Sequence, residues 1–419
     1  MSMETRKPAD LPAPAGGAPR YALVLSGGGA RGAYEAGILG WILDDLPPRL
    51  GRPVRFDILT GTSVGAIHAC FLAGTAGSPG AGARLTDLWH GLDLARVFRV
   101  RLGQLLAIPF RSLGIVGPRR RRPESGIPER LAGLLDSLPL ERLVRDVVPW
   151  AALRRNVDAG VVEAVAVTAT EIATGRSIVW IDNRERRVVR WARDPFIVAR
   201  PAALGPAHAL ASAAIPLLFP APRVDGGYYC DGSLRLNTPL APALRLGGNR
   251  LLIVGLTHAD GARNAASAPE EGYGSLFYLG GKVLNALLLD HVDYDVDRLR
   301  IVNAILDTGV RAYGPDFLAR MNATVEAERG TAYQVVRNVY LRPSQDIAAI
   351  AADCLAHRPP ATGWRGRLAD LVLRHAMRGG DADLLSYLYF DRCYADHLIA
   401  LGRADAEAQA DALLDFFSA

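Results

Sequence analysis

The segment Phe56-Asp-Ile-Leu-Thr-Gly-Thr-Ser-Val-Gly65 joins a short apolar run to a turn bounded by two glycines. The apolar run predicts a buried strand, and the apolar residues after the turn predict a helix. A second unit of this kind stands upstream, where the run Tyr21-Ala-Leu-Val-Leu-Ser26 leads into Gly27-Gly-Gly-Ala-Arg-Gly32 and a helical pattern that ends at Pro47-Pro48. Strand, glycine turn and helix in repeated order favour the α/β class, with right-handed crossovers between parallel strands.

The pattern of short apolar runs continues downstream, and then the character of the chain changes. Residues 161–168 and 251–256 predict further buried strands, whereas residues 177–181 and 188–191 predict a hairpin. From about Tyr273 onward the pattern is mostly helical. We therefore expect three regions, which are a disordered tail over 1–20, a core over 21–260 with a variable, lid-like insertion at 75–160, and a mostly helical C-terminal region over 261–419 packed on the core.

The composition excludes some classes of partner. The 419 residues are 50% hydrophobic and carry a formal net charge of +5, an excess too small to indicate nucleic-acid binding. The cysteines Cys70, Cys230, Cys354 and Cys393 are scattered without metal-ligand spacing, so we expect reduced thiols and no zinc site. The sequence does not specify an oligomeric state.

No segment predicts a membrane span or a cleaved leader. The first 20 residues are rich in Pro, Ala and Gly and lack the apolar core of a signal peptide. Residues 201–222 are uncharged and long enough to span a bilayer, but Pro206, Pro216 and Pro220 interrupt them. We therefore expect a cytoplasmic protein or one that contacts a membrane from its surface.

The glycine turn after the first strand admits three interpretations. Gly27, Gly29 and Gly32 match the G-x-G-x-x-G pattern of dinucleotide-binding folds, but that fold requires an acid at the end of the next strand, where this sequence has none. Alternatively, the amides of Gly28 and Gly29, with Gly27 as a further donor, hold an oxyanion, and Arg31 adds positive charge beside it. The third interpretation is a tight turn that serves packing only.

Ser63 is the candidate nucleophile. Gly61-Thr-Ser-Val-Gly65 matches G-x-S-x-G and lies between a predicted strand and a predicted helix, which is the setting of a nucleophile elbow. Gly61 and Gly65 leave room for the sharp bend, and the helix N-terminus favours negative charge at the turn. Because the five-residue pattern is common by chance, the assignment depends on this setting.

A serine nucleophile needs a base within hydrogen-bond reach, and several residues compete for that role. His258 follows a predicted strand, where the histidine of a Ser–Asp–His triad could lie. His68 lies five residues after Ser63, and on a helix that offset points its side chain away from the turn. An aspartate acting without histidine is the third option, and both Asp225 and Asp231 precede a glycine.

Four stretches, in this order, resemble the signature blocks of the patatin-like phospholipases of the bacterial type. They are Gly27-Gly-Gly-Ala-Arg-Gly32, Gly61-Thr-Ser-Val-Gly65, Ala211-Ser-Ala-Ala-Ile-Pro216 and Asp231-Gly-Ser-Leu-Arg-Leu-Asn-Thr-Pro239. The resemblance extends over about residues 21–256. It implies a three-layer α/β fold in which helices flank a mostly parallel central sheet, extended in this chain by the helical C-terminal region.

The resemblance also implies a Ser–Asp dyad without a catalytic histidine. In the last block of the family, the aspartate precedes an Asn by six positions and a Pro by eight. Asp231 meets both conditions through Asn237 and Pro239, and Gly232 matches the glycine that follows the aspartate. Asp225 meets neither condition and is expected in a turn.

The activity implied is that of a serine carboxylic-ester hydrolase. It would cleave phospholipid, lysophospholipid or acylglycerol esters through an acyl-enzyme, with no metal or other cofactor. The arginines at 119–122 are expected either to meet anionic headgroups or to form a solvated loop. The acidic stretch at 290–297 lacks an EF-hand pattern and is interpreted as a charged helix face. The alternative function is an effector or signalling lipase that stays silent until a partner or a membrane engages it.

Overall fold

The computed structural model describes residues 18–100, 133, 135–188, 191, 194–258, 292–357 and 386–418. The strands of its central sheet are β1 (Tyr21–Leu25), β2 (Ile58–Thr62), β5 (Ala164–Glu171), β6 (Ser177–Asn183), β7 (Ile197–Pro201), β8 (Arg223–Val224), β9 (Gly227–Asp231), β10 (Arg250–Val254) and β11 (Arg337–Leu341). Their order is β11-β10-β1-β2-β5-β6-β7, with β9 paired to β5 and β8 to β9. A separate two-stranded sheet joins β3 (Arg99–Val100) to β4 (Leu135–Asp136).

The sheet is mostly parallel, as the sequence predicts. The strands from β11 through β10, β1 and β2 to β5 pair in parallel, and so do β6 and β7. Only the pairs β5–β6, β5–β9 and β8–β9 are antiparallel. The predicted hairpin between residues 177–181 and 188–191 is wrong, because both edges of β6 are already occupied, by β5 and by β7. Part of residues 188–191 lies outside the described residues.

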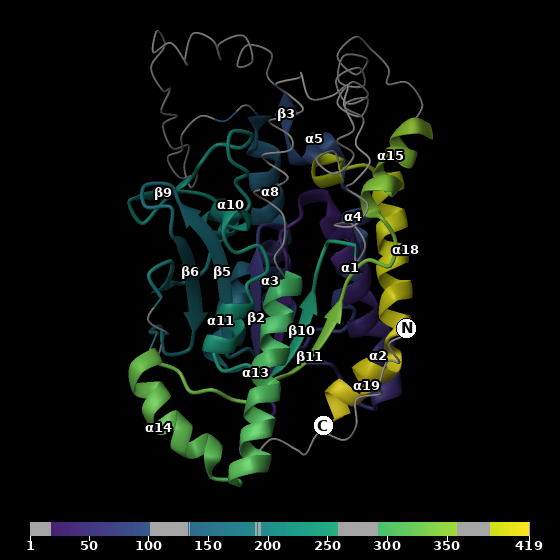
Figure 1. The fold of residues 1–419 in the computed structure, drawn as a ribbon. Coiled ribbons are helices and arrows are strands. Elements are labelled where there is room, and N and C mark those ends of the chain that lie inside the picture. The colour runs from purple at the N-terminus through teal and green to yellow at the C-terminus, as the bar shows by residue number, and fades with distance from the viewer. Residues whose placement is uncertain are drawn as a thin grey trace, which may run out of the picture.

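Helices cover both faces of the sheet (Figure 1). Successive residues of β1 show this division, since Leu23 and Leu25 belong to the larger apolar core and Ala22 and Val24 to the smaller one. The helices in the larger core are α1 (Gly32–Gly40), α2 (Leu46–Leu50), α3 (Val64–Thr75), α4 (Ala81–His90), α9 (Trp150–Asp158), α15 (Ile347–His357), α18 (Arg392–Ala408) and α19 (Ala410–Ser418). Those in the smaller core are α11 (Leu240–Arg245) and α13 (Val292–Tyr313).

Shorter or more peripheral elements complete the described chain. They are α5 (Leu94–Val97), α8 (Leu138–Val147), α10 (Pro206–Ser212), α14 (Phe317–Arg329), the 3-10 turns η1 (Gly29–Arg31) and η3 (Gly232–Leu234), and the π-helical turn η2 (Trp41–Asp45). No helix among the described residues is both long enough and apolar enough to cross a membrane.

The sequence predicts that the first long helix ends at Pro47-Pro48, but in the structure the helix continues past both prolines. It passes through η2 and resumes as α2, whose first turn contains both prolines. Proline is tolerated at that place because the first turn of a helix needs no backbone N–H donors. The helix ends instead at Gly51, which has a positive φ of 71°.

The end of the chain packs against its beginning. Helix α18 lies along α1, and α19 places the rings of Phe416 and Phe417 within 5.6 Å and 5.3 Å of the Tyr21 ring, measured between centroids (Figure 1). Cys354 of α15 and Cys393 of α18 form a disulfide, which corrects the expectation of four reduced thiols. The sequence could not reveal this pair, because its members are 39 residues apart and meet only through the packing of two helices.

Candidate active site

Ser63 lies in the turn between β2 and α3. Its backbone has φ 55° and ψ −122°, a combination that a residue with a side chain rarely adopts and that the surrounding structure must hold in place. The amide of Ser63 donates to Ser212 Oγ at 2.8 Å, and Ser212 Oγ donates to the carbonyl O of Thr168 at 2.5 Å. Ser212 is not singled out by the sequence alone, although it lies within the block Ala211–Pro216.

The glycines on either side of Ser63 allow the tight turn. A Cβ at Gly65 would lie 2.6 Å from the carbonyl O of Leu25, and one at Gly61 would lie 2.2 Å from the carbonyl O of Gly65. Because both obstacles are backbone atoms, the start of α3 can lie this close to β1 and β2 only with glycine at these positions.

Asp231 ends β9 and faces Ser63. Its Oδ2 accepts a hydrogen bond from Ser63 Oγ at 2.7 Å, and its Oδ1 accepts one from the amide of Ser233 at 2.8 Å. Its own amide donates to the carbonyl O of Ala214 at 2.8 Å. Ala214 and Ser212 belong to the same short segment, so this segment supports the backbone of both Ser63 and Asp231.

The environment of Asp231 makes its carboxylate a stronger base than a carboxylate in water. The side chain is buried, and this loss of solvation raises the pKa of Asp231 to about 6, against a partial opposing effect of the hydrogen bonds from Ser63 and Ser233. A pKa nearer neutrality suits proton transfer at physiological pH. Asp225, by contrast, lies exposed in the turn between β8 and β9, as predicted.

The glycine turn runs beside Ser63. A Cβ at Gly27 would lie 3.1 Å from Ser63 Cβ, but the amide of Gly27 donates to the carbonyl O of Asn237 at 3.1 Å. Gly27 therefore lets the glycine turn approach Ser63 closely, but its amide is already paired. This corrects the expectation that Gly27 is a further donor to an oxyanion. The amides of Gly28 and Gly29 have no acceptor within the described part of the chain. Gly29 has a φ of 56° and lines the same cavity as Ser63.

Arg31 is buried and turns toward the C-terminal part of the chain. Its Nε donates to Ser386 Oγ at 2.8 Å, and its Nη1 donates to the carbonyl O of Leu256 at 3.3 Å. Its Cζ lies 4.0 Å from the centroid of the Tyr387 ring. No local signal in the sequence connects Ser386 and Tyr387 with Arg31, which lies 355 positions before Ser386.

The last of the four blocks anchors the glycine turn to the sheet. Asn237 accepts from Gly27, Thr238 Oγ1 lies 2.6 Å from Ser26 Oγ, and the carbonyl O of Pro239 accepts from Thr60 Oγ1 at 3.2 Å. Gly232 follows Asp231 at the start of η3, where a Cβ would lie 2.4 Å from the carbonyl O of Thr168. These contacts give structural reasons for residues that the sequence singles out only by resemblance.

Neither histidine considered in the sequence analysis donates to or accepts from Ser63 in the described structure. His68 is buried, with Nδ1 2.8 Å from Glu35 Oε2, and its Nε2 accepts from Trp89 Nε1 at 2.9 Å. Because both ring nitrogens are engaged, His68 is a packed histidine, as predicted, although it lines the same cavity as Ser63. Burial raises the pKa of Glu35 beside it. His258 Nε2 lies 3.2 Å from the carbonyl O of Ser344.

An apolar cavity of about 90 Å³ opens next to Ser63. Its walls come mainly from α3, α4, α8, residues 213–219 and residues 387–390, and they are almost entirely aliphatic or aromatic. Val64, Ile67, His68 and Phe71 follow one face of α3, so the cavity extends along this helix for about two turns, or roughly 10 Å at 1.5 Å per residue. Its apolar lining suits part of a hydrocarbon chain.

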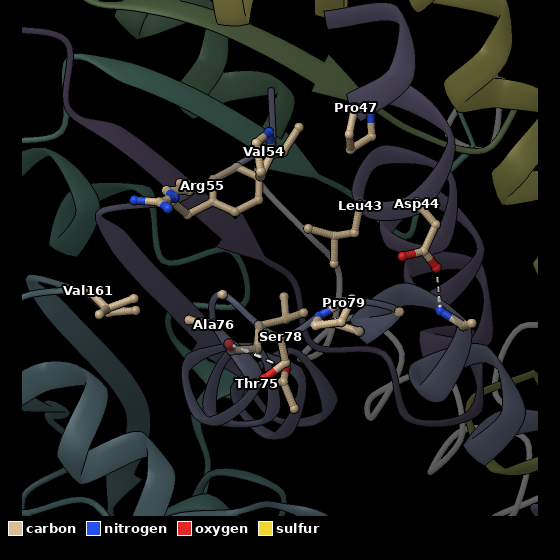
Figure 2. A pocket seen from close by; sticks show the side chains of 18 of the residues that line it. Leu43, Asp44, Pro47, Val54, Arg55, Thr75, Ala76, Ser78, Pro79 and Val161 are labelled. Atoms are coloured by element: carbon tan, nitrogen blue, oxygen red, sulfur yellow. Dashed lines mark hydrogen bonds between the residues drawn. The ribbon is translucent and has the colours of Figure 1, made fainter. Parts of the chain in front are cut away.

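A second cavity, of about 720 Å³, lies at the N-terminal ends of β2 and β5, away from Ser63 (Figure 2). Pro47, Val54 and Arg55 lie among its walls, and Asp44 Oδ2 on its rim accepts from the amide of Ala83 at 2.6 Å. None of the predicted site residues lines it. The apolar cavity beside Ser63 is therefore the candidate site.

Two groups of possible metal ligands are already engaged with other side chains. Cys354, Cys393 and His397 place one ligand atom each within 4.8 Å of one another, but the two sulfurs are joined as a disulfide. In the acidic stretch, Asp293 pairs with Arg342 and Asp297 with Arg300. Asp290 and the arginines at 119–122 lie outside the described residues, as does the first part of the N-terminal tail.

Comparison with known proteins gives a similar solved structure and a family match. The crystal structure of VipD from Legionella pneumophila is similar at 13% identity and a TM-score of 0.29, over 94% of this chain and 75% of that one. No curated protein sequence matches the chain. The family model described as patatin-like phospholipase matches residues 23–244, which is more than half of the chain and includes Gly27, Ser63 and Asp231. This chain is therefore a member of the patatin-like phospholipase family, whose general activity is lipid acyl hydrolysis.

Proposed function

We propose that this protein cleaves carboxylic esters of lipids, with Ser63 as the nucleophile and Asp231 as the general base. The observation that carries the proposal is the buried hydrogen bond of 2.7 Å from Ser63 Oγ to Asp231 Oδ2. It aligns the serine proton with a carboxylate whose pKa is raised to about 6 by burial. A nucleophile in a strained turn, paired with a positioned base, is the arrangement that covalent ester hydrolysis requires.

The proposed reaction has two halves. Ser63 Oγ attacks the ester carbonyl carbon while its proton moves to Asp231, and collapse of the tetrahedral intermediate breaks the bond to the leaving alcohol oxygen, which takes that proton. Water then attacks the acyl-enzyme, and Asp231 accepts a proton from the water. Ser63 leaves with its proton restored from Asp231, and the second product is a fatty acid.

The negative charge of each tetrahedral intermediate needs donors beside Ser63. The amides of Gly28 and Gly29 are proposed for this role, because neither has an acceptor within the described residues and Gly29 lines the cavity. Gly27 is left out of this role since its amide donates to Asn237. Arg31 acts indirectly, because it contacts Ser386 and Tyr387, and the backbone of Tyr387 packs on Gly29.

The apolar cavity is proposed to hold the acyl chain of the substrate. Among the described residues, its walls carry no Asp, Glu, Lys or Arg, which fits phospholipid, lysophospholipid and acylglycerol esters as candidate substrates, because these share a long acyl chain. We also propose that the protein meets its substrate at a membrane surface. Leu217 supports this, since its side chain is 82% exposed between Ile215 and Phe219, which both line the cavity.

The test compares Ser63→Ala, Asp231→Asn and His258→Ala with the wild type on a soluble p-nitrophenyl ester and on a panel of the three lipid classes. The first two substitutions are expected to lower kcat by about 10⁴-fold or more, and His258→Ala is expected to keep wild-type activity. Asp231→Asn preserves side-chain shape, so its effect reports on proton transfer. Full activity of Asp231→Asn together with loss in His258→Ala would replace the dyad with a triad.

A further inference from the structure

Residues 386–390 reach the candidate active site from far beyond the family match. That match ends at residue 244, yet Tyr387, Leu388 and Phe390 line the same cavity as Gly29 and Ser63. The apolar wall of the cavity is therefore built partly by the C-terminal region of the chain.

Arg31 contacts this segment through Ser386 and Tyr387 and is itself held by Leu256. Its Nε donates to Ser386 Oγ at 2.8 Å, its guanidinium carbon lies 4.0 Å above the ring of Tyr387, and its Nη1 donates to the carbonyl O of Leu256. Only the planar, forked head of arginine can stack on a ring and donate in two directions at once. The side chain is 4% exposed, so these contacts are shielded from solvent.

The segment in turn presses on the glycine turn. A Cβ at Gly29 would lie 2.2 Å from the carbonyl O of Tyr387, so these two stretches of backbone are in direct contact. Gly29 adopts a φ of 56° at this point. The orientation of the amides proposed to hold the oxyanion is thus fixed on one side by the C-terminal segment.

Helix α18 anchors the segment to the core. It begins at Arg392, immediately after the segment, and approaches α1 so closely that a Cβ at Gly37 would lie 2.3 Å from the carbonyl O of Ile399. Tyr34 Oη donates to Asp405 Oδ2 at 2.8 Å between the same helices. The ring of Phe390 stacks on Trp89 at 6.2 Å between centroids.

We infer that Arg31 is a positioning residue, and that the segment 386–390 is a working part of the active site. Arg31 clamps the segment onto Gly29, which orients the oxyanion amides, and the side chains of Leu388 and Phe390 complete the wall for the acyl chain. This inference rests on the proposed function of Ser63 and Asp231. It means that the C-terminal helices belong to the catalytic unit.

The test uses two substitutions of Arg31 and a matched control. Arg31→Gln removes the charge and the fork, Arg31→Lys keeps only the charge, and Arg245→Gln alters another largely buried arginine that lies over a ring, that of Trp191, outside the cavity. Both Arg31 variants are expected to lower kcat by about 100-fold with KM changed by less than about 3-fold, as displacement of catalytic groups does. The control is expected to keep its kcat.

Two further variants report on the wall of the cavity. Leu388→Ala and Phe390→Ala are expected to move the preference among C4 to C16 p-nitrophenyl esters toward longer chains, with the Ser63→Ala variant inactive throughout. Wild-type kcat in Arg31→Lys would overturn the clamp, because charge alone would then suffice. An equal loss in Arg245→Gln and Arg31→Gln would also overturn it, since the effect would be general destabilisation. Activity in Ser63→Ala would instead refute the proposed function itself.

Discussion

Ser63 Oγ donates to Asp231 Oδ2 at 2.7 Å, although the two residues are 168 positions apart in the chain. Strand β5 brings them together, because it pairs with β2 at Thr62–Thr168 and with β9 at Ala169–Asp231. Two consecutive residues of one strand thus set the places of the nucleophile turn and of the carboxylate. Because the register of a buried sheet is strongly specified, this distance is a property of the whole sheet and not of two flexible side chains.

The first prediction concerns the pH dependence of hydrolysis. Asp231 must be ionised to accept the proton of Ser63, and burial raises its pKa to about 6. We expect kcat/KM on a soluble ester to rise with pH through a single ionisation near pH 6 and to level off above it. The measurement is a pH–rate profile from pH 4.5 to 8.5, repeated with His258→Ala as the control. If the rise of kcat/KM with pH disappears in His258→Ala, the ionisation belongs to His258 and not to Asp231.

The second prediction is that Asp231→Asn stabilises the fold while it removes activity. The pKa of Asp231 is about 6 in the folded state and 3.8 in the unfolded chain. Ionising this carboxyl in the folded protein therefore costs about 3 kcal/mol at neutral pH. The asparagine can still accept from Ser233 and donate to Ser63. We expect its free energy of unfolding to exceed that of the wild type by about 1–3 kcal/mol at pH 7.5.

The same comparison at low pH provides the control. At about pH 3, below both pKa values, the aspartic acid is largely protonated in both the folded and the unfolded chain, so the advantage of Asp231→Asn should vanish. Urea unfolding at about pH 3 and at about pH 7.5 measures both values. A variant that is less stable than the wild type at pH 7.5 would show that the hydrogen bonds to the carboxylate outweigh its desolvation.

Much of the site was predictable from sequence because it is encoded in short blocks. The strand–turn–helix pattern marks the turn of Ser63, and the spacing to Asn237 and Pro239 separates Asp231 from Asp225. In the structure these spacings correspond to contacts with neighbouring strands, such as the bond from Thr60 to Pro239. The expected parallel sheet is present for the same reason, since β1, β2, β5 and β10 each carry an apolar signal of their own.

What could not be predicted depends on contacts between distant segments. Arg31 and Ser386 are 355 positions apart, and nothing near either residue indicates the other. The disulfide between Cys354 and Cys393 likewise arises from the packing of α15 beside α18. Similarly, β6 pairs in parallel with β7, whereas the sequence predicts a hairpin between β6 and the apolar run at 188–191 that follows it.

The third prediction compares two neighbouring glycines of the turn. At Gly29, an alanine would combine a φ of 56° with a Cβ 2.2 Å from the backbone carbonyl of Tyr387. At Gly28, the φ is −175° and the Cβ would meet side chains and no backbone, with the end of Leu256 at 2.3 Å and Arg31 Cβ at 3.3 Å. We expect Gly29→Ala to lower kcat by about 100-fold and to lower Tm, because backbone must move.

Gly28→Ala is the matched variant and should be milder in both respects. The side chain of Leu256 can change rotamer, whereas the carbonyl of Tyr387 cannot leave without displacing the segment before α18. Steady-state kinetics and thermal melts of both variants decide the point. Equal losses in the two variants would mean that the contact of Gly29 with Tyr387 has no special importance.

The fourth prediction concerns the disulfide between Cys354 and Cys393. By closing a loop of 39 residues, it should raise the free energy of unfolding by about 2–4 kcal/mol through loss of freedom in the unfolded chain. Peptide mapping without reductant should recover the linked pair, and both reductant and Cys393→Ser should lower Tm. Reductant should have no further effect on Cys393→Ser. Free thiols together with stoichiometric zinc in the purified protein would contradict the disulfide and favour a site with His397.

The fifth prediction tests contact with a lipid surface at Leu217. This residue combines an 82% exposed apolar side chain with a φ of 67°, an unfavourable conformation for leucine. Ile215 and Phe219 on either side point into the cavity beside Ser63, so Leu217 stands at its edge. Since burying a leucine side chain contributes about 1.5–3 kcal/mol, its insertion would strengthen binding to a bilayer by about 10-fold or more.

Leu217→Asn removes the apolar side chain and introduces a residue that tolerates positive φ, so folding should not suffer. We expect turnover of a soluble ester to stay within about 2-fold of the wild type, and hydrolysis of phospholipid vesicles to fall by about 10-fold. Ile305→Asn is the control, because Ile305 is 60% exposed on α13, which packs on the opposite face of the sheet. Equal losses on soluble and vesicle substrates would place Leu217 in the acyl wall, whereas unchanged vesicle hydrolysis would show that the bilayer is met elsewhere.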